Sequence, residues 1–119
     1  MEVIKLLLSL QAQIRLWHWL TKSYAQHLAF GKTYESLDDR VDRFVEIYLG
    51  KNKDIKIESE TFIKFYDLDL SNPKKVINTY INILQNDFLN HIESNDDLRN
   101  IKDDIIGDLN QLKYLLELE

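Results

Sequence analysis

The sequence predicts an all-α fold, a four-helix bundle formed by a single domain over residues 1–119. Three glycines and one proline are few turn-forming residues for 119 positions, which favours long helices over many short strands. Hydrophobic residues make up 45% of the chain, enough to build one core. Apolar residues recur every three or four positions along four segments, the spacing of a helix with one buried face.

The first predicted helix covers residues 2–21. Its apolar residues form a helical stripe: Val3, Leu6, Leu7, Leu10, Ile14, Trp17 and Leu20. The apolar run that opens this helix is soon followed by Gln11, Gln13 and Arg15, and no small-residue cleavage site appears. It therefore fits neither a secretory signal nor a membrane span, and we expect a cytoplasmic protein.

The second predicted helix begins after Ser23, a suitable N-cap, and ends at Gly50. Its stripe consists of Tyr24, His27, Phe30, Tyr34, Leu37, Val41, Phe44 and Tyr48. Residues 51–56 are polar and rich in lysine, and the apolar stretch Ser59 to Tyr66 is too short for a main helix. We therefore expect a short extra helix in this connection.

Asn72 followed by Pro73 is typical of a cap and a first helical turn, and it starts the third predicted helix. The stripe of this helix is Val76, Ile77, Tyr80, Ile81, Leu84, Phe88, Leu89 and Ile92. Asn95 can cap the fourth, whose stripe is Leu98, Ile101, Ile105, Leu109, Leu112 and Leu116. Only the connection between the second and third helices is long, so we expect a ferritin-like bundle with one crossover.

Charge and composition argue against several functions. The net charge of −5 offers no concentrated positive charge for phosphates, so strong nucleic-acid binding is not expected. The absence of cysteine excludes disulfides, thiol catalysis and cysteine-ligated zinc. The sequence also lacks a glycine-rich phosphate loop, a serine nucleophile elbow, an HExxH motif and paired ExxH motifs, which argues against a di-iron centre within one chain.

Four residues of the first two helices can bind a divalent metal: His18, His27, Asp42 and Glu46. Asp42 and Glu46 are like charges one helical turn apart, which is mildly destabilising unless a cation lies between them. The alternative is a solvated helix face, on which Arg40 and Arg43 neutralise the carboxylates and Asp39 pairs with Arg43.

The histidines also have an alternative interpretation. His18 and His27 both fall near apolar faces, where a histidine is more often a core residue than a ligand, although two of them flank one tight turn. His91 and Asp87 are explained more simply by the helix dipole and by mutual pairing than by a metal. Trp19 falls on the polar side of its helix, which indicates an oligomer interface or cover from the crossover.

These residues resemble those of the Dps-type miniferritins, in the ferritin-like superfamily, over nearly the whole chain. Members carry a His-Trp pair at the end of the first helix, a His in the first turn of the second, and an Asp-x-x-x-Glu pair further along it. His18 with Trp19, His27, and Asp42 with Glu46 match this pattern, including the interval from His27 to Asp42. The chain is also similar to small ferritin-like proteins of bacteriophages, so it could be virus-encoded and act in the host cytoplasm.

The resemblance implies a site between two subunits that binds and oxidises ferrous iron, one chain supplying the histidines and its partner the later carboxylates. Two features depart from the family. Gly31 stands where a carboxylate is expected, and the turn between His18 and His27 is three residues shorter than usual. The missing carboxylate favours a mononuclear site over a full ferroxidase, although Glu35 could reach in from the next turn.

We therefore expect a homo-oligomer that binds iron or zinc at an intersubunit site made of His18, His27, Asp42 and Glu46. If the metal is iron, the expected activity is oxidation of Fe(II) and its sequestration. The alternative is an interaction or structural protein that retained the bundle without its chemistry and binds a protein partner, and Gly31 is the best support for this. Nucleic-acid compaction ranks last because of the charge.

Overall fold

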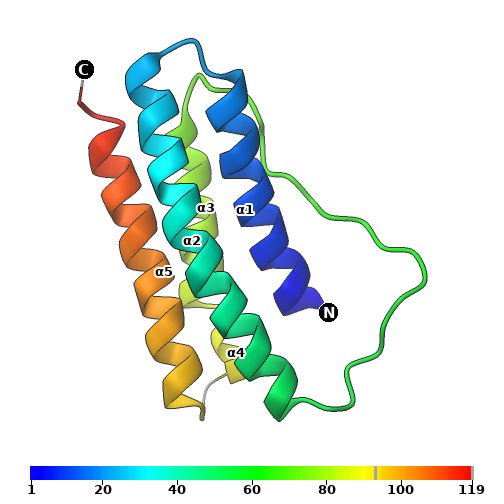
Figure 1. The fold of residues 1–119 in the computed structure, drawn as a ribbon. Helices are drawn as coiled ribbons and strands as arrows, with labels where there is room; N and C mark the ends of the chain where they lie inside the picture. Colours follow the sequence, from blue (N-terminus) through cyan, green and yellow to red (C-terminus); the bar gives the residue numbers. More distant parts are fainter. Residues whose placement is uncertain (93, 119) are drawn as a thin grey trace.

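The computed structural model describes residues 1–92 and 94–118, and these residues form helices and connections but no strand (Figure 1). Four helices are long: α1 (Glu2–Leu20), α2 (Tyr24–Lys51), α3 (Pro73–Gln85) and α5 (Asp96–Leu115). The fifth, α4 (Leu89–Ile92), is a single turn. The predicted all-α class is confirmed. None of the helices in the described part is long and apolar enough to cross a membrane.

The four long helices lie side by side (Figure 1). Long helices that follow one another in the sequence run in opposite directions, except α2 and α3, which are parallel. A short turn over residues 21–23 joins α1 to α2, and the two helices run in opposite directions. Residues 52–72 return along the outside of the molecule, so α3 runs in the same direction as α2. The last helix, α5, runs back and packs on both α2 and α3.

The predicted stripes supply one core between the helices. Its largest fully buried side chains include Trp17, Phe30, Phe44 and Tyr80, and the rings of Trp17 and Phe30 lie 5.5 Å apart between α1 and α2. Leu20 and Tyr24 belong to the predicted stripes but are exposed. They lie at the end of α1 and the start of α2, on either side of the 21–23 turn and beyond the core. The side chain of Leu89 lies outside what the structure describes.

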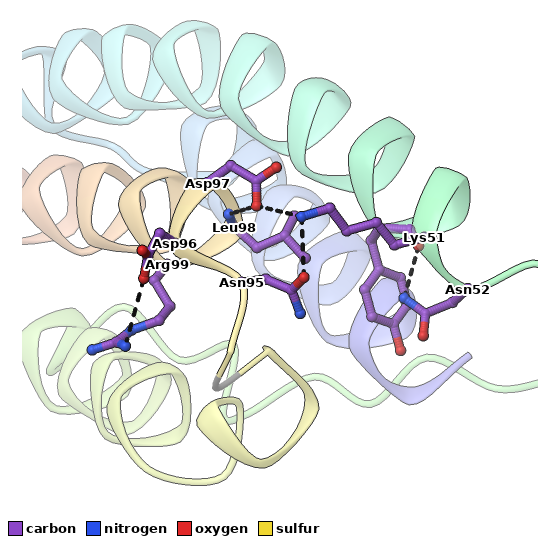
Figure 2. A network of polar contacts seen from close by, with 8 residues as sticks. Lys51, Asn52, Asn95, Asp96, Asp97, Leu98 and Arg99 are labelled. Carbon is purple, nitrogen blue, oxygen red and sulfur yellow. Dashed lines mark hydrogen bonds and ion pairs between the residues drawn. The ribbon is translucent and has the colours of Figure 1, made fainter.

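Two of the three predicted N-caps are confirmed. The Ser23 hydroxyl accepts a hydrogen bond from the backbone N–H of Gln26, and the Asn72 side chain accepts one from that of Lys75. Asn95 precedes α5 but caps no backbone N–H. Figure 2 shows instead that its side-chain oxygen accepts a hydrogen bond from the Lys51 ammonium at 3.0 Å.

The third predicted helix is wrong in extent, because α3 ends at Gln85 rather than continuing through Ile92. The side-chain amide of Asn86 donates to the carbonyl of Asn82 at 2.9 Å, competing locally with helical bonding. The backbone N–H of Phe88 then bonds to the carbonyl of Ile83, five residues back. This wider turn separates α3 from α4.

The predicted short helix at Ser59–Tyr66 is also wrong, because residues 52–72 contain no helix. Their second half has no regular secondary structure, with Asp67 at a positive φ of 37°, and its backbone pairs with side chains of α1. We call this set of contacts the α1 ladder, and its three rungs are Ser9 with Lys64, Gln13 with Tyr66, and Trp17 with Leu68.

The contacts of the α1 ladder can form because four residues of helix and two residues of the crossover have similar lengths. Four residues of an α-helix rise about 6 Å, and two residues of chain span up to about 6.6 Å when extended, a span within which the positive φ of Asp67 can be accommodated. Every fourth residue of α1 therefore meets every second residue of the crossover. A helix over Ser59–Tyr66 would use the N–H of Tyr66 internally and would place the carbonyls of Lys64 and Tyr66 only about 3 Å apart along its axis. These carbonyls could then not both meet the buried side chains of Ser9 and Gln13, which are about 6 Å apart along α1.

Candidate metal site at the turn between α1 and α2

Two of the four predicted ligands, His18 and His27, meet at the turn that joins the first two helices. His18 lies in the last turn of α1 and His27 in the first turn of α2. Their rings stack with centroids 3.9 Å apart and planes 17° from parallel. Nδ1 of His18 lies 2.7 Å from the carbonyl oxygen of His27, and Nδ1 of His27 lies 2.8 Å from that of His18. We call this reciprocal pair the His clasp.

The carbonyl partners fix which nitrogen carries the proton in each neutral ring. A carbonyl oxygen only accepts hydrogen bonds, so both Nδ1 atoms donate. Nε2 of each neutral ring then keeps its lone pair, which is the form that binds a metal. A metal-binding histidine is commonly oriented by this kind of Nδ1–H bond to a backbone carbonyl.

The His clasp also has a structural effect. The carbonyl of His18 is one of the last four of α1, which have no partner within the helix, and His27 supplies its donor. Both rings are half-buried. The clasp therefore contributes to the tight turn whether or not it binds a metal.

Gly31 provides the space that the His18 ring occupies. A Cβ atom at residue 31 would lie 2.9 Å from Cε1 and 3.0 Å from Nδ1 of His18, too close for either atom to stay in place. The carboxylate that the miniferritin resemblance expects here would therefore displace His18. Glu35, the suggested substitute, is exposed one turn further along.

Asp42 and Glu46 do not join the histidines within one chain. Asp42 follows His27 by fifteen residues on the same helix, which corresponds to roughly 22 Å along its axis. Both carboxylates are exposed. Over residues 1–92 and 94–118, no group of three or more His, Asp or Glu side chains is arranged to hold a metal.

Arg40, one of the two arginines predicted to neutralise this acidic face, pairs with α5 instead. Arg40 binds Asp108 of α5 through Nε at 2.5 Å and lies 3.6 Å from Asp104. The hydrogen bond to Asp108 raises the pKa of the Arg40 guanidinium. Asp39 and Arg43 form no ion pair among the described residues, so the predicted pairing is wrong. Asp42 and Glu46 are likewise unpaired in that part of the chain.

Trp19 is 62% exposed, so the crossover does not cover it and the alternative, an oligomer interface, stays a prediction. The guanidinium of Arg15 lies 5.1 Å from the Trp19 ring and 4.5 Å from that of Tyr34 on α2. Phe65 of the crossover reaches the same surface but does not cover Trp19. Arg15, Trp19, Tyr34 and Phe65 line a groove of about 450 Å³, which we call the Trp19 groove. The other residues that line it are on α1: Leu8, Gln11, Ala12 and Leu16.

His91, the third histidine, is exposed at the other end of the bundle. It borders a cavity of about 180 Å³ together with Asp87 and Glu2. The predicted pairing of His91 with Asp87 is not seen among the described residues. His91 is therefore a suitable control for the two clasp histidines.

Comparison with known proteins gives a family and one phage relative. Residues 18–116 match a family described as "Family of unknown function (DUF5856)", a range that includes all four predicted ligands. The chain is 32% identical over 122 residues to an "Uncharacterized 14.6 kDa protein in mobD-ri intergenic region" of Enterobacteria phage T4. That alignment covers 99% of this chain and 88% of the phage protein. No solved structure matches the chain.

Proposed function

The chain belongs to the DUF5856 family of unknown function, and from its own residues we propose that it is a Dps-like protein of ferritin-like fold that binds a divalent metal between two copies of the chain. His18 and His27 of one copy supply two nitrogen ligands. Asp42 and Glu46 of the other copy supply oxygen ligands. A second copy is required because the histidines and carboxylates of one chain are roughly 22 Å apart.

The order of the helices supports the ferritin-like part of this proposal. A bundle with one long crossover places its second and third helices in the same direction. The crossover over residues 52–72 and the parallel course of α2 and α3 agree with that topology (Figure 1).

The observation that carries the metal proposal is the His clasp. It brings together two imidazoles that are nine residues apart in sequence, and it commits Nδ1 of each while leaving Nε2 uncommitted. Asp42 and Glu46 are exposed and form no ion pair among the described residues, so they are available to a neighbouring chain. Two like charges at this spacing gain from a cation held between them.

Imidazole nitrogen and carboxylate oxygen suit both zinc and iron. The miniferritin resemblance favours iron, and the chemistry would then be oxidation of Fe(II) to a sequestered ferric form. Because Gly31 offers no carboxylate and its space holds the His18 ring, we propose one metal per site rather than two.

A second candidate is a phage-type ferritin-like protein that acts only by binding a protein partner. The Trp19 groove favours it, because an exposed tryptophan beside further apolar side chains marks many interaction surfaces. For either candidate, the phage relative supports a virus-encoded protein acting in the host cytoplasm.

Native mass spectrometry with and without Fe(II) or Zn(II) separates the two candidates, since it reports subunit number and bound metal together. We expect a closed oligomer that takes up about one ion per subunit. The double variant His27→Ala with Asp42→Ala should lose the metal while its far-ultraviolet circular dichroism stays unchanged.

The matched control is His91→Ala with Asp39→Ala, which also removes one imidazole and one exposed carboxylate of α2. It should keep the metal. Unchanged metal content in the His27 and Asp42 double variant would eliminate the proposed site. A wild-type monomer that takes up neither ion would eliminate the metal function and favour the partner-binding candidate.

A further inference from the structure

The stacked rings of the His clasp cannot both bind one ion as they stand. The lone pair of a neutral imidazole nitrogen lies in the plane of its ring, and a zinc–nitrogen bond is about 2.0–2.1 Å long. The ring centroids are 3.9 Å apart and the planes nearly parallel. Because the planes are nearly parallel, the two Nε2 lone pairs do not converge on one point, and an ion in the plane of one ring lies out of the plane of the other.

We propose that the His clasp is a self-closed arrangement of the ligand pair that competes with metal binding, and that Gly31 is the positioning residue that permits it. This inference rests on the proposed metal function and describes the regulation of that site. For both rings to bind one ion, His18 has to leave the space above Gly31. The energy of the stack and of two Nδ1–H bonds opposes this movement.

The Gly31→Ala variant fills that space. Its Cβ would meet the His18 ring at 2.9 Å, so the ring has to shift, and we expect the closed arrangement to be lost. A ligand that binds only the open state has an apparent affinity reduced by the fraction of open molecules. If about one wild-type molecule in ten is open, Gly31→Ala should bind Zn(II) about tenfold more tightly.

Two measurements test this on the full-length chain. Long-range proton–nitrogen NMR of histidine-labelled protein reports which ring nitrogen carries the proton, and Zn(II) calorimetry reports affinity. In the wild type both clasp histidines should show the Nδ1–H form. In Gly31→Ala the His18 signals should lose that form, and the Zn(II) affinity should rise.

Gly107→Ala is the matched control, because a Cβ at this helical glycine of α5 meets nothing within 4 Å. It should raise the Tm by about 3 °C, as expected when an exposed helical glycine becomes alanine, and leave Zn(II) affinity unchanged. Gly31→Ala should instead lower the Tm in the wild-type background. In a His18→Ala background it should raise the Tm as Gly107→Ala does, which tests the contact even if the single variant folds poorly.

Unchanged His18 signals in Gly31→Ala would overturn the inference, and so would an equal Tm effect in the two backgrounds. Altered signals with unchanged or weaker Zn(II) binding would also overturn it, because the clasp would then not compete with the metal. No Zn(II) uptake by the wild type is a different result. It would refute the proposed function itself, and the inference about its regulation would fall with it.

Discussion

The α1 ladder and the His clasp both join a side chain to a distant backbone group, but they use their polar atoms differently. In the ladder, Gln13 is fully buried, and its amide bonds to the N–H and carbonyl of Tyr66 and to the hydroxyl of Tyr80. In the clasp, each ring is half-buried and commits one nitrogen of two.

This difference separates a structural polar network from a candidate binding site. A buried network in which every group is paired fixes one conformation and has nothing left to offer a ligand. No buried side-chain nitrogen or oxygen in the described part of the chain lacks a partner. A pair that lies near the surface and keeps one lone pair on each ring can exchange its stacking contact for an ion.

The largest expected effect is the loss of the central rung of the ladder. Gln13→Leu removes the hydrogen bonds to Tyr66 and Tyr80, so the backbone N–H and carbonyl of Tyr66 lose this partner and the Tyr80 hydroxyl keeps only its bond with Ser9. We expect the free energy of unfolding to fall by about 3 kcal/mol and the Tm by roughly 12 °C. Urea and thermal unfolding, followed by circular dichroism, measure both.

The control for this change is Gln11→Leu, two residues away on the half-exposed surface, where the side chain makes one long hydrogen bond of 3.4 Å to Asp38. It should change stability by less than about 0.5 kcal/mol. If the two leucine variants were equally stable, the ladder would not hold the crossover as described.

Much of the fold was predictable because its helices depend on local features. The period of the apolar residues gave the four long helices, and Ser23 and Asn72 marked two helix starts. The crossover was predicted wrongly because its backbone partners are on α1, more than fifty residues away. The only trace of the ladder in the sequence is that Ser9 and Gln13 interrupt an apolar face at a spacing of four.

The candidate site was predictable only in part. The proximity of His18 and His27 follows from one tight turn, so their sequence positions were sufficient. The reason for Gly31 could not be found in the sequence, because it depends on the direction in which the His18 ring points. The relation of Asp42 and Glu46 to the histidines depends on a second chain.

The outer rung of the ladder should matter less than the central one. Trp17→Phe loses the 2.9 Å hydrogen bond from the indole N–H to the carbonyl of Leu68 and leaves a small void in the core. We expect the free energy of unfolding to fall by about 2 kcal/mol. Trp19→Phe, at an exposed position one residue from His18, should change it by less than about 0.5 kcal/mol. Similar losses from both variants in urea unfolding would contradict the assignment of Trp17 to the ladder.

The loss of stability at alkaline pH tests the burial of the Tyr80 hydroxyl, which connects the α1 ladder to α3. Burial raises the pKa of Tyr80 from 10.0 to about 12, although the hydrogen bond with Ser9 acts in the opposite direction. Between these values the unfolded chain releases the proton while the folded chain keeps it, so stability is lost as the pH rises. Tyr80 should account for a loss of about 1.5 kcal/mol between pH 10 and 11.5.

Urea unfolding across this pH range, compared between the wild type and Tyr80→Phe, isolates the contribution of the Tyr80 hydroxyl to this loss of stability. The phenylalanine variant should be less stable at neutral pH but should lose stability more slowly above pH 10. Tyr114→Phe, at an exposed position on α5, should keep the wild-type slope. A slope that Tyr80→Phe leaves unchanged would show that this hydroxyl is not buried in solution.

The smallest expected effect is the loss of one ring of the His clasp. His27→Ala removes the stack and the donor to the His18 carbonyl, but water can reach this half-buried end of α1 and replace that hydrogen bond. We expect the free energy of unfolding to fall by about 1 kcal/mol, with His91→Ala near zero. A loss as large as that of Gln13→Leu would place the clasp among the structural networks. A small loss accompanied by loss of bound metal would show that the pair is kept for binding rather than for stability.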